Sequence, residues 1–181
     1  MNYLSPLSSI LQILLAGLVV TAAIYDLRYR RIPNWLNLAG LLFGLGANAY
    51  LSGLQGLGRA GLGLGLGFIL YFPLFLLHAR GAGDVKLLAA IGSITGPGNV
   101  FAIAIISAIL GGVVAIVLLL IKGRLRKTLW NITWILRDLS QFRAPYSTSP
   151  ELDVNNPEAV RLPHAAVIAL GILAFFAVNR P

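Results

Sequence analysis

The sequence contains no cysteine and little charge. Because none of its 181 residues is cysteine, this chain can form no disulfide, no thiolate metal site and no cysteine nucleophile. Its two histidines, His78 and His164, are too few for a histidine-rich metal site. Charged residues make up 11% of the chain and hydrophobic residues 57%. In soluble domains, charged residues average about 25% and apolar residues about 45–50%. The composition therefore predicts an integral membrane protein in contact with the lipid bilayer.

The hydrophobic residues form segments whose lengths suit membrane-spanning helices, which need about 17–25 residues. There are six such segments: residues 7–25, 35–51, 57–77, 85–95, 100–121 and 163–178. The first lacks the features of a cleaved signal peptide, so we expect it to be retained. The fourth is short and ends at Gly96-Pro97-Gly98, so it either begins near Gly83 or is shielded by its neighbours. The sequence predicts an all-α, polytopic fold that forms a single membrane domain over residues 1–181.

The basic residues are unevenly distributed between the two sides of this topology. With the N-terminus outside, all fourteen Lys and Arg residues except Arg59 and Arg180 fall on the cytoplasmic side. Such a bias sets the orientation of membrane proteins. We therefore expect both termini outside, with cytoplasmic loops over residues 26–34, 78–86 and 122–162. The net charge of +8 then reflects topology, and no nucleic-acid partner is expected.

The long cytoplasmic loop, residues 122–162, has two parts. Apolar residues of the first part recur every three or four positions between residues 125 and 139, which predicts an amphipathic helix. Such a helix would either lie in the headgroup region or extend the fifth segment, and both remain open. Residues 144–157 are rich in Pro, Ser and Asn and predict a loop.

The third segment carries glycine at alternate positions. Gly61, Gly63, Gly65 and Gly67 form two overlapping small-xxx-small pairs. Such pairs let helix backbones approach closely within membranes, so we expect this segment to pack directly on a neighbour. A phosphate-binding loop is not expected, because the glycines lie in an apolar span and no Lys-Ser or Lys-Thr follows.

Two acidic residues lie where acids are unusual. Four of the six are in the long loop: Asp138, Glu151, Asp153 and Glu158. Asp26 follows the first segment and Asp84 precedes the fourth, both at the cytoplasmic edge. Acids at the hydrocarbon edge are rare and mark functional sites, although each could simply pair with a nearby base such as Arg28 or Lys86.

Two neighbouring carboxylates suit peptide hydrolysis. Like-charge repulsion makes a close pair share one proton. The ionised member can take a proton from water, and the protonated member can polarise the peptide carbonyl. This chemistry needs neither a metal nor a cofactor.

The residues around the two acids suggest supporting roles. Gly81 and Gly83 precede Asp84 and permit unusual backbone conformations and close approach of another chain, as an extended peptide substrate requires. Lys86 would hold Asp84, meet a substrate acid or anchor the helix at the headgroups. Pro33 disfavours helix at the residue before it, and Asn34 then begins the next helix as a cap.

These residues resemble a known family. Residues 81–87, Gly-Ala-Gly-Asp-Val-Lys-Leu, resemble the GxGD motif of membrane aspartic proteases, as it occurs in type IV prepilin peptidases. Asp26 followed by Arg28, Arg31 and Ile32-Pro33-Asn34 resembles the other half of their signature. Residues 162–165, Leu-Pro-His-Ala, leading to Gly171 are similar to a degenerate form of their last helix. The resemblance covers about residues 21–171.

The resemblance implies a membrane aspartic endopeptidase with Asp26 and Asp84 as catalytic pair. Gly81, Gly83, Lys86, Pro33 and Asn34 would shape the substrate site. Such an enzyme cleaves the short basic leader of prepilins or pseudopilins at the cytoplasmic face of the inner membrane. Bifunctional members add an N-terminal region with four zinc-binding cysteines and N-methylate the product. With no cysteine, this chain is expected to cleave without methylating, like the small peptidases of tight-adherence (Flp) pilus systems or the archaeal preflagellin peptidases.

Two other functions fit parts of the pattern. Presenilin-like or signal-peptide-peptidase-like proteases also join a Tyr-Asp, here Tyr25-Asp26, to a GxGD motif. The basic Ile-Pro-Asn continuation, the small size and the lack of a clear Pro-Ala-Leu motif argue against them. A small transporter could use Asp26 and Asp84 as a proton relay, but such acids usually lie near the membrane midplane.

We expect a structural role for His164.

Overall fold

The computed structural model describes residues 7–76, 81–121, 123 and 164–178. Within these ranges every regular element is an α-helix: α1 (Ser9–Tyr29), α2 (Asn34–Leu76), α3 (Ala82–Ile121) and α6 (His164–Val178). The all-α prediction is confirmed. Helices α1, α2 and α3 are each long and apolar enough to cross a membrane, and α6 is a shorter apolar helix. The helix predicted over residues 125–139 and the loop over 144–157 lie outside the described residues.

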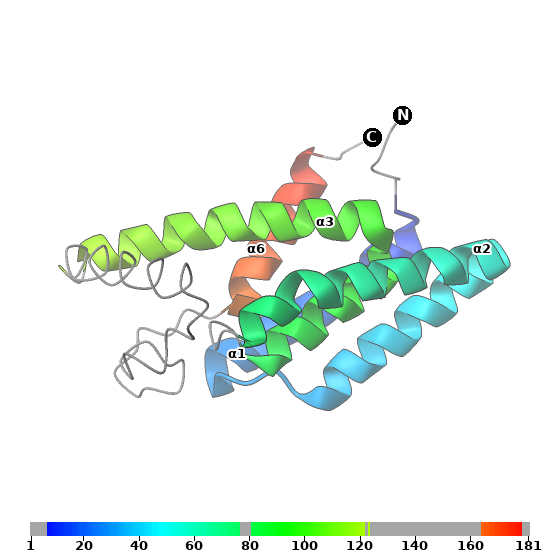
Figure 1. The fold of residues 1–181 in the computed structure, drawn as a ribbon, viewed down its shortest axis with the longest axis horizontal. Helices are drawn as coiled ribbons and strands as arrows, with labels where there is room; N and C mark the ends of the chain where they lie inside the picture. The colour runs from blue at the N-terminus through cyan, green and yellow to red at the C-terminus, as the bar shows by residue number, and fades with distance from the viewer. Residues whose placement is uncertain (1–6, 77–80, 122, 124–163, 179–181) are drawn as a thin grey trace.

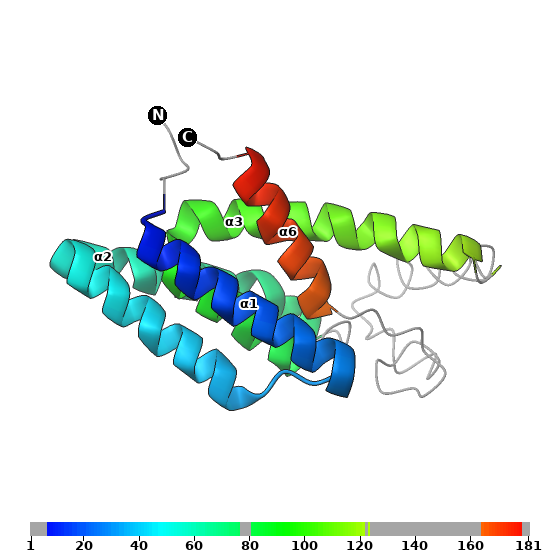
Figure 2. The same ribbon diagram turned by 180° about the vertical axis from the view of Figure 1, so that it is seen from behind.

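Helix α2 is bent into a hairpin. Its backbone leaves the helical region at Ser52 and at Gly53, where φ is 57°. Glycine adopts positive φ without the steric cost that a Cβ brings. Figures 1 and 2 show that the two halves of α2 run back along each other from this point. The break predicted between residues 51 and 57 is therefore confirmed.

Helix α3 is broken at Gly96 and repaired by a side chain from α2. Gly96 has φ 77° and ψ 174°, and Pro97 follows it. Proline has no N–H, so the carbonyl of Ser93, four residues earlier, loses its helical donor. The buried Asn48 of α2 donates its Nδ2 to the carbonyls of Ser93 (3.0 Å) and Ile94 (3.1 Å). The predicted stop at Gly96-Pro97-Gly98 is confirmed, and the Ser93 and Ile94 carbonyls beside it are bonded.

The first half of α3 forms the centre of the molecule. Residues 87–96 are buried without interruption, and the side chains of Leu87, Leu88 and Ile91 are fully enclosed. Helices α1, α2 and α6 surround this half, as the two opposite views show (Figures 1 and 2). The helix of the short fourth segment begins at Ala82, next to Gly83, and is also shielded by its neighbours, so both alternatives predicted for it are met.

The outer surface is apolar as well as the core. Large hydrophobic side chains face outward from every described helix, for example Ile13 on α1 and Leu54 on α2, the latter 86% exposed. Exposure of such a large apolar surface to water would be unfavourable. Contact between the same surface and lipid tails is favourable, because it leaves no polar group without a partner. The surface and the helix lengths together agree with a membrane protein.

Close packing of α2 on α3 depends on one of the two predicted glycine pairs. A Cβ on Gly63 would overlap the carbonyl oxygen of Gly92, and a Cβ on Gly67 would overlap the carbonyl oxygen of Leu88. No described atom lies within 4 Å of the corresponding positions on Gly61 and Gly65. The close-packing prediction is therefore right for Gly63 and Gly67 only.

This difference gives a matched test. We expect Gly63→Ala to lower the free energy of unfolding by about 1–3 kcal/mol, because the added methyl group forces two backbones apart. Gly65→Ala should leave stability unchanged or raise it by about 0.5–1 kcal/mol, since alanine favours helix and meets free space. Thermal unfolding in detergent measures both. Equal effects of the two variants would contradict the packing described here.

Candidate functional site

Asp26 lies in the last turn of α1. The first segment was predicted to end at Tyr25, but the helix continues to Tyr29. It continues because helix formation does not require apolar residues, and it ends where Arg30 adopts a left-handed conformation with φ 52°. The N–H of Arg30 then bonds the carbonyl of Asp26 at 2.8 Å, as is common at helix C-termini. The half-buried Asp26 side chain is thus carried by a rigid helical turn.

The carboxylate of Asp26 binds the beginning of α6. Its Oδ2 accepts a hydrogen bond from the backbone N–H of Ala165, the second residue of α6, at 2.8 Å. The first N–H groups of a helix have no partner within the helix, and the helix dipole favours an anionic group there. Ala165 itself is fully buried. The last described helix is therefore docked by its N-terminus onto Asp26, 139 positions away in the chain.

Three aromatic residues that lie near Asp26 in the sequence are in contact with one another. The ring of Tyr25 packs against those of Tyr29 (5.6 Å between centroids) and Trp35 (6.2 Å). The guanidinium of Arg28 lies over the Tyr29 ring at 5.7 Å. Tyr29 and Trp35 are exposed, and exposed Trp and Tyr gather at membrane–water interfaces. The cluster therefore marks this end of the helices as an interfacial one.

Asp84 lies in the first turn of α3, and its side chain is half-buried. Its N–H bonds the carbonyl of Gly81 at 3.1 Å, so the chain turns tightly into the helix. Neither Gly81 nor Gly83 has positive φ; among described glycines only Gly53, Gly96 and Gly123 do. The prediction of an unusual backbone at these glycines was wrong, because residues 82–84 are already helical and need only ordinary φ.

What these two glycines provide is space. No described atom lies within 4 Å of where a Cβ on Gly81 would be. A Cβ on Gly83 would lie 3.4 Å from Cβ of Ile32, at ordinary contact distance. The open side of Gly81 agrees with the expectation of room next to Asp84, and Gly83 brings the residues before α2 against the start of α3.

The first turns of α2 and α3 are joined by side-chain hydrogen bonds. Lys86 donates its Nζ to Oδ1 of Asn34 at 2.9 Å, a contact with α2 that the sequence did not predict. Asn37 donates its Nδ2 to the carbonyl of Gly83 at 3.4 Å. Helix α2 begins at Asn34, where the sequence predicted its start, but the side-chain oxygen that was expected to cap this helix accepts from Lys86. Residues of the Ile32-Pro33-Asn34 and GxGD segments, distant in sequence, are thereby in contact.

Pro33 contributes its backbone to this junction. Its carbonyl accepts hydrogen bonds from the N–H groups of Leu36 (3.2 Å) and Asn37 (3.4 Å). The chain between α1 and α2 thus makes its turn at Pro33, as predicted, and Asn37 is held by both its backbone and its side chain.

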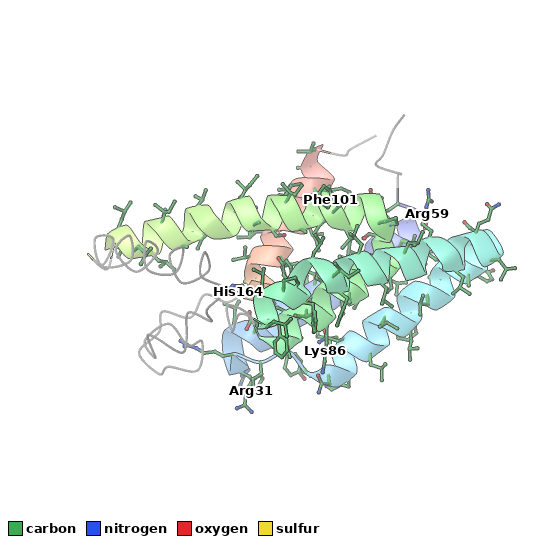
Figure 3. All side chains as sticks on the ribbon, in the orientation of Figure 1. Arg31, Arg59, Lys86, Phe101 and His164 are labelled. Atoms are coloured by element: carbon green, nitrogen blue, oxygen red, sulfur yellow. The ribbon has the colours of Figure 1, made fainter. Side chains whose placement is uncertain are left out.

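Several helix ends of the described part of the chain meet at this end of the molecule. They include the last turn of α1, which carries Asp26, and the first turns of α2, α3 and α6. Figure 3 shows Arg31, Lys86 and His164 toward this end and Arg59 toward the opposite one. His164 is the first residue of α6 and half-buried. Contacts thus join the residues before and at the start of α2 to Gly83 and Lys86, and Tyr25, next to Asp26, to Trp35 on α2.

Two contributors were not anticipated from the sequence. Ala165 acts through its backbone N–H, which no residue type reveals. Asn37 is a buried amide within a predicted apolar span, and this polar exception was a signal that could have indicated it.

The chain also matches known proteins over this region. Residues 13–116, more than half of the chain, match the type IV leader peptidase family. The chain belongs to that family. The matched range includes both acids, most of α1, all of α2 and most of α3, while α6 lies beyond it.

A second comparison found a relative of this leader peptidase family member whose alignment is longer than the family match. A protein of Xanthomonas campestris pv. campestris described as "Prepilin leader peptidase/N-methyltransferase" is 31% identical over 126 residues. The alignment covers 64% of this chain and 42% of that protein. The chain therefore spans less than half the length of this relative. No solved structure matches the chain.

The bond between Asp26 and α6 can be tested by hydrogen exchange. In Asp26→Leu, exchange of the Ala165 amide should rise about two- to tenfold, because a protein hydrogen bond contributes about 0.5–1.5 kcal/mol. Asp26→Asn keeps an acceptor oxygen and should protect this amide better. The Ala166 amide in the same turn is the internal control. A parallel rise at both amides would indicate general loosening of α6 and contradict a specific bond.

Proposed function

We propose that this family member is an aspartic endopeptidase that removes the leader peptide of prepilin-like proteins, with Asp26 and Asp84 as its catalytic pair. The main support is the meeting of several helix ends at one interfacial end of the part of the protein that the structure describes. There Asp26 is fixed by the N-terminus of α6, and the turn that carries Asp84 is bonded to α2. Family membership and the name of the Xanthomonas relative support a prepilin leader as substrate.

The proposed reaction needs only these two carboxyl groups and water. Two close carboxylates share one proton. The ionised group takes a proton from water as the water oxygen attacks the peptide carbonyl carbon, and the protonated group donates a hydrogen bond to the carbonyl oxygen. When the C–N bond breaks, the amine leaves with a proton from the pair, and the pair is restored. Because Oδ2 of Asp26 accepts from Ala165, we assign its contact with water to Oδ1.

We further propose six membrane spans, with both termini outside and the site at the cytoplasmic face of the inner membrane. The breaks at Ser52–Gly53 and Gly96 divide α2 and α3 into two halves each, which with α1 and α6 gives six segments. The side chain of Arg59 lies next to Gly96, with its Cγ 3.1 Å from where a Cβ would be. Arg31 and Lys86 lie toward the other end (Figure 3), as the positive-inside rule predicts. A substrate whose leader is basic and cytoplasmic would reach the acids from that side.

For this chain we propose cleavage without methylation. The relative's name includes both activities, and in the bifunctional enzymes that this sequence resembles, methylation accompanies a four-cysteine zinc region. This chain has no cysteine. Mass spectrometry of the cleaved pilin should therefore find an unmodified N-terminal amine.

The catalytic pair is tested with a co-expressed prepilin. Asp26→Asn and Asp84→Asn should each reduce cleavage by about 10²–10⁴-fold, the usual contribution of a general acid or base. Both variants should still insert in the membrane. Asp153→Asn, which changes an acid of the 122–162 loop, is the matched control and should cleave as the wild type does. Substantial processing by either Asp26→Asn or Asp84→Asn would exclude the pair mechanism.

The topology is tested with single cysteines, for which the cysteine-free chain offers no background. A membrane-impermeant maleimide added to spheroplasts should label Arg59→Cys and not Arg31→Cys. Permeabilised cells should show labelling of both variants, and the wild type should remain unlabelled. Labelling of Arg31→Cys from outside would reverse the proposed orientation.

A further inference from the structure

Asn37 is a buried amide near the GxGD turn. It lies in the first turn of α2, is 4% exposed and stands next to Leu36 on the buried face of that helix. Its Nδ2 donates to the carbonyl of Gly83 at 3.4 Å. The two residues are 46 positions apart, so this contact reaches from one helix to the residue before Asp84.

The side-chain oxygen of Asn37 lowers the stability that this residue contributes to the fold. Its Oδ1 is buried and, among the described residues, has no hydrogen-bond partner. A buried acceptor without a partner keeps the full cost of its desolvation, and an apolar side chain of similar shape would avoid that cost. Stability alone therefore favours leucine over asparagine here. Local departures from the most stable choice are expected where a residue serves function.

The peptide unit that joins Gly83 to Asp84 is held at both of its polar ends. Its oxygen is the Gly83 carbonyl that accepts from Asn37. Its N–H is that of Asp84, which donates to the carbonyl of Gly81 at 3.1 Å. The plane of this peptide sets the direction in which the Asp84 side chain leaves the backbone. Hydrogen bonds at both ends of this peptide therefore fix the direction in which the Asp84 side chain leaves the backbone.

We propose that Asn37 is a positioning residue that acts through the Gly83 carbonyl to orient Asp84 in the catalytic pair. This inference rests on the proposed function. Reacting groups must be held in a narrow range of geometries, and a misplacement of about 1 Å can reduce the rate about 10²-fold. Loss of the Nδ2 hydrogen bond should then affect the chemical step and leave substrate binding largely intact.

Asn48 provides a matched control on the same helix. It too is a buried asparagine of α2 whose Nδ2 donates to backbone carbonyls of α3, those of Ser93 and Ile94. Its contacts lie at the Gly96 break, at the other end of the first half of α3. The two residues share their chemistry, burial and helix pair, and differ in whether they adjoin Asp84.

The test measures unfolding temperature, kcat and KM of purified full-length variants with a prepilin substrate. Asn37→Leu should unfold at or above the wild-type temperature, lose about tenfold in kcat and keep its KM. Asn37→Ala, a smaller change, should likewise lower kcat. Asn48→Leu should lower the unfolding temperature and keep the kcat of the folded fraction.

Two results would overturn the inference: wild-type kcat in both Asn37 variants, or a joint loss of stability and activity like that of a destabilised core variant. Asp84→Asn, assayed alongside, separates this failure from that of the proposed function. If Asp84→Asn is inactive while Asn37→Leu keeps full kcat, only the role of Asn37 fails. If Asp84→Asn remains active, the proposed catalytic pair fails and the Asn37 inference with it.

Discussion

Every backbone group that a helix releases within a membrane needs a partner from the protein itself, because the hydrocarbon offers none. This constraint explains the least regular part of the fold. The break at Gly96 and Pro97 frees the Ser93 carbonyl, and Asn48 bonds it from the neighbouring helix. Asn48 can reach because Gly44, one turn before it on α2, places no side chain between that helix and Ser93 and Ile94 of α3. The break, the buried amide and the close approach at Gly44 therefore act together.

The same constraint explains why backbone groups make many of the hydrogen bonds in the candidate site. Helix ends carry backbone groups without partners inside the helix, so a place where several helix ends meet is rich in fixed donors and acceptors. At this end of the molecule, Asp26 takes a donor from α6 and the Gly83 carbonyl takes one from Asn37. The two proposed catalytic acids are thus carried by backbone segments that other helices hold in place.

Much of this arrangement could be predicted from local sequence. Segment lengths and turn residues indicated the helices and the breaks near residues 52 and 96, and the scarcity of acids singled out Asp26 and Asp84. What failed depended on contacts between distant residues. The alternate glycines looked equivalent, yet only Gly63 and Gly67 face α3. Gly83 was expected to have a special conformation, whereas it has no positive φ and lies in ordinary contact with Ile32. The partner of Asp26 is a backbone N–H, for which side-chain type carries no information.

The bond between Asp26 and Ala165 also orders events in time. Asp26 is synthesised 139 positions before its partner. The complete surroundings of Asp26 therefore exist only after α6 has been synthesised and inserted. Until then the growing chain holds both acids without this contact, so the hydrolytic activity proposed here would begin only once α6 is in place.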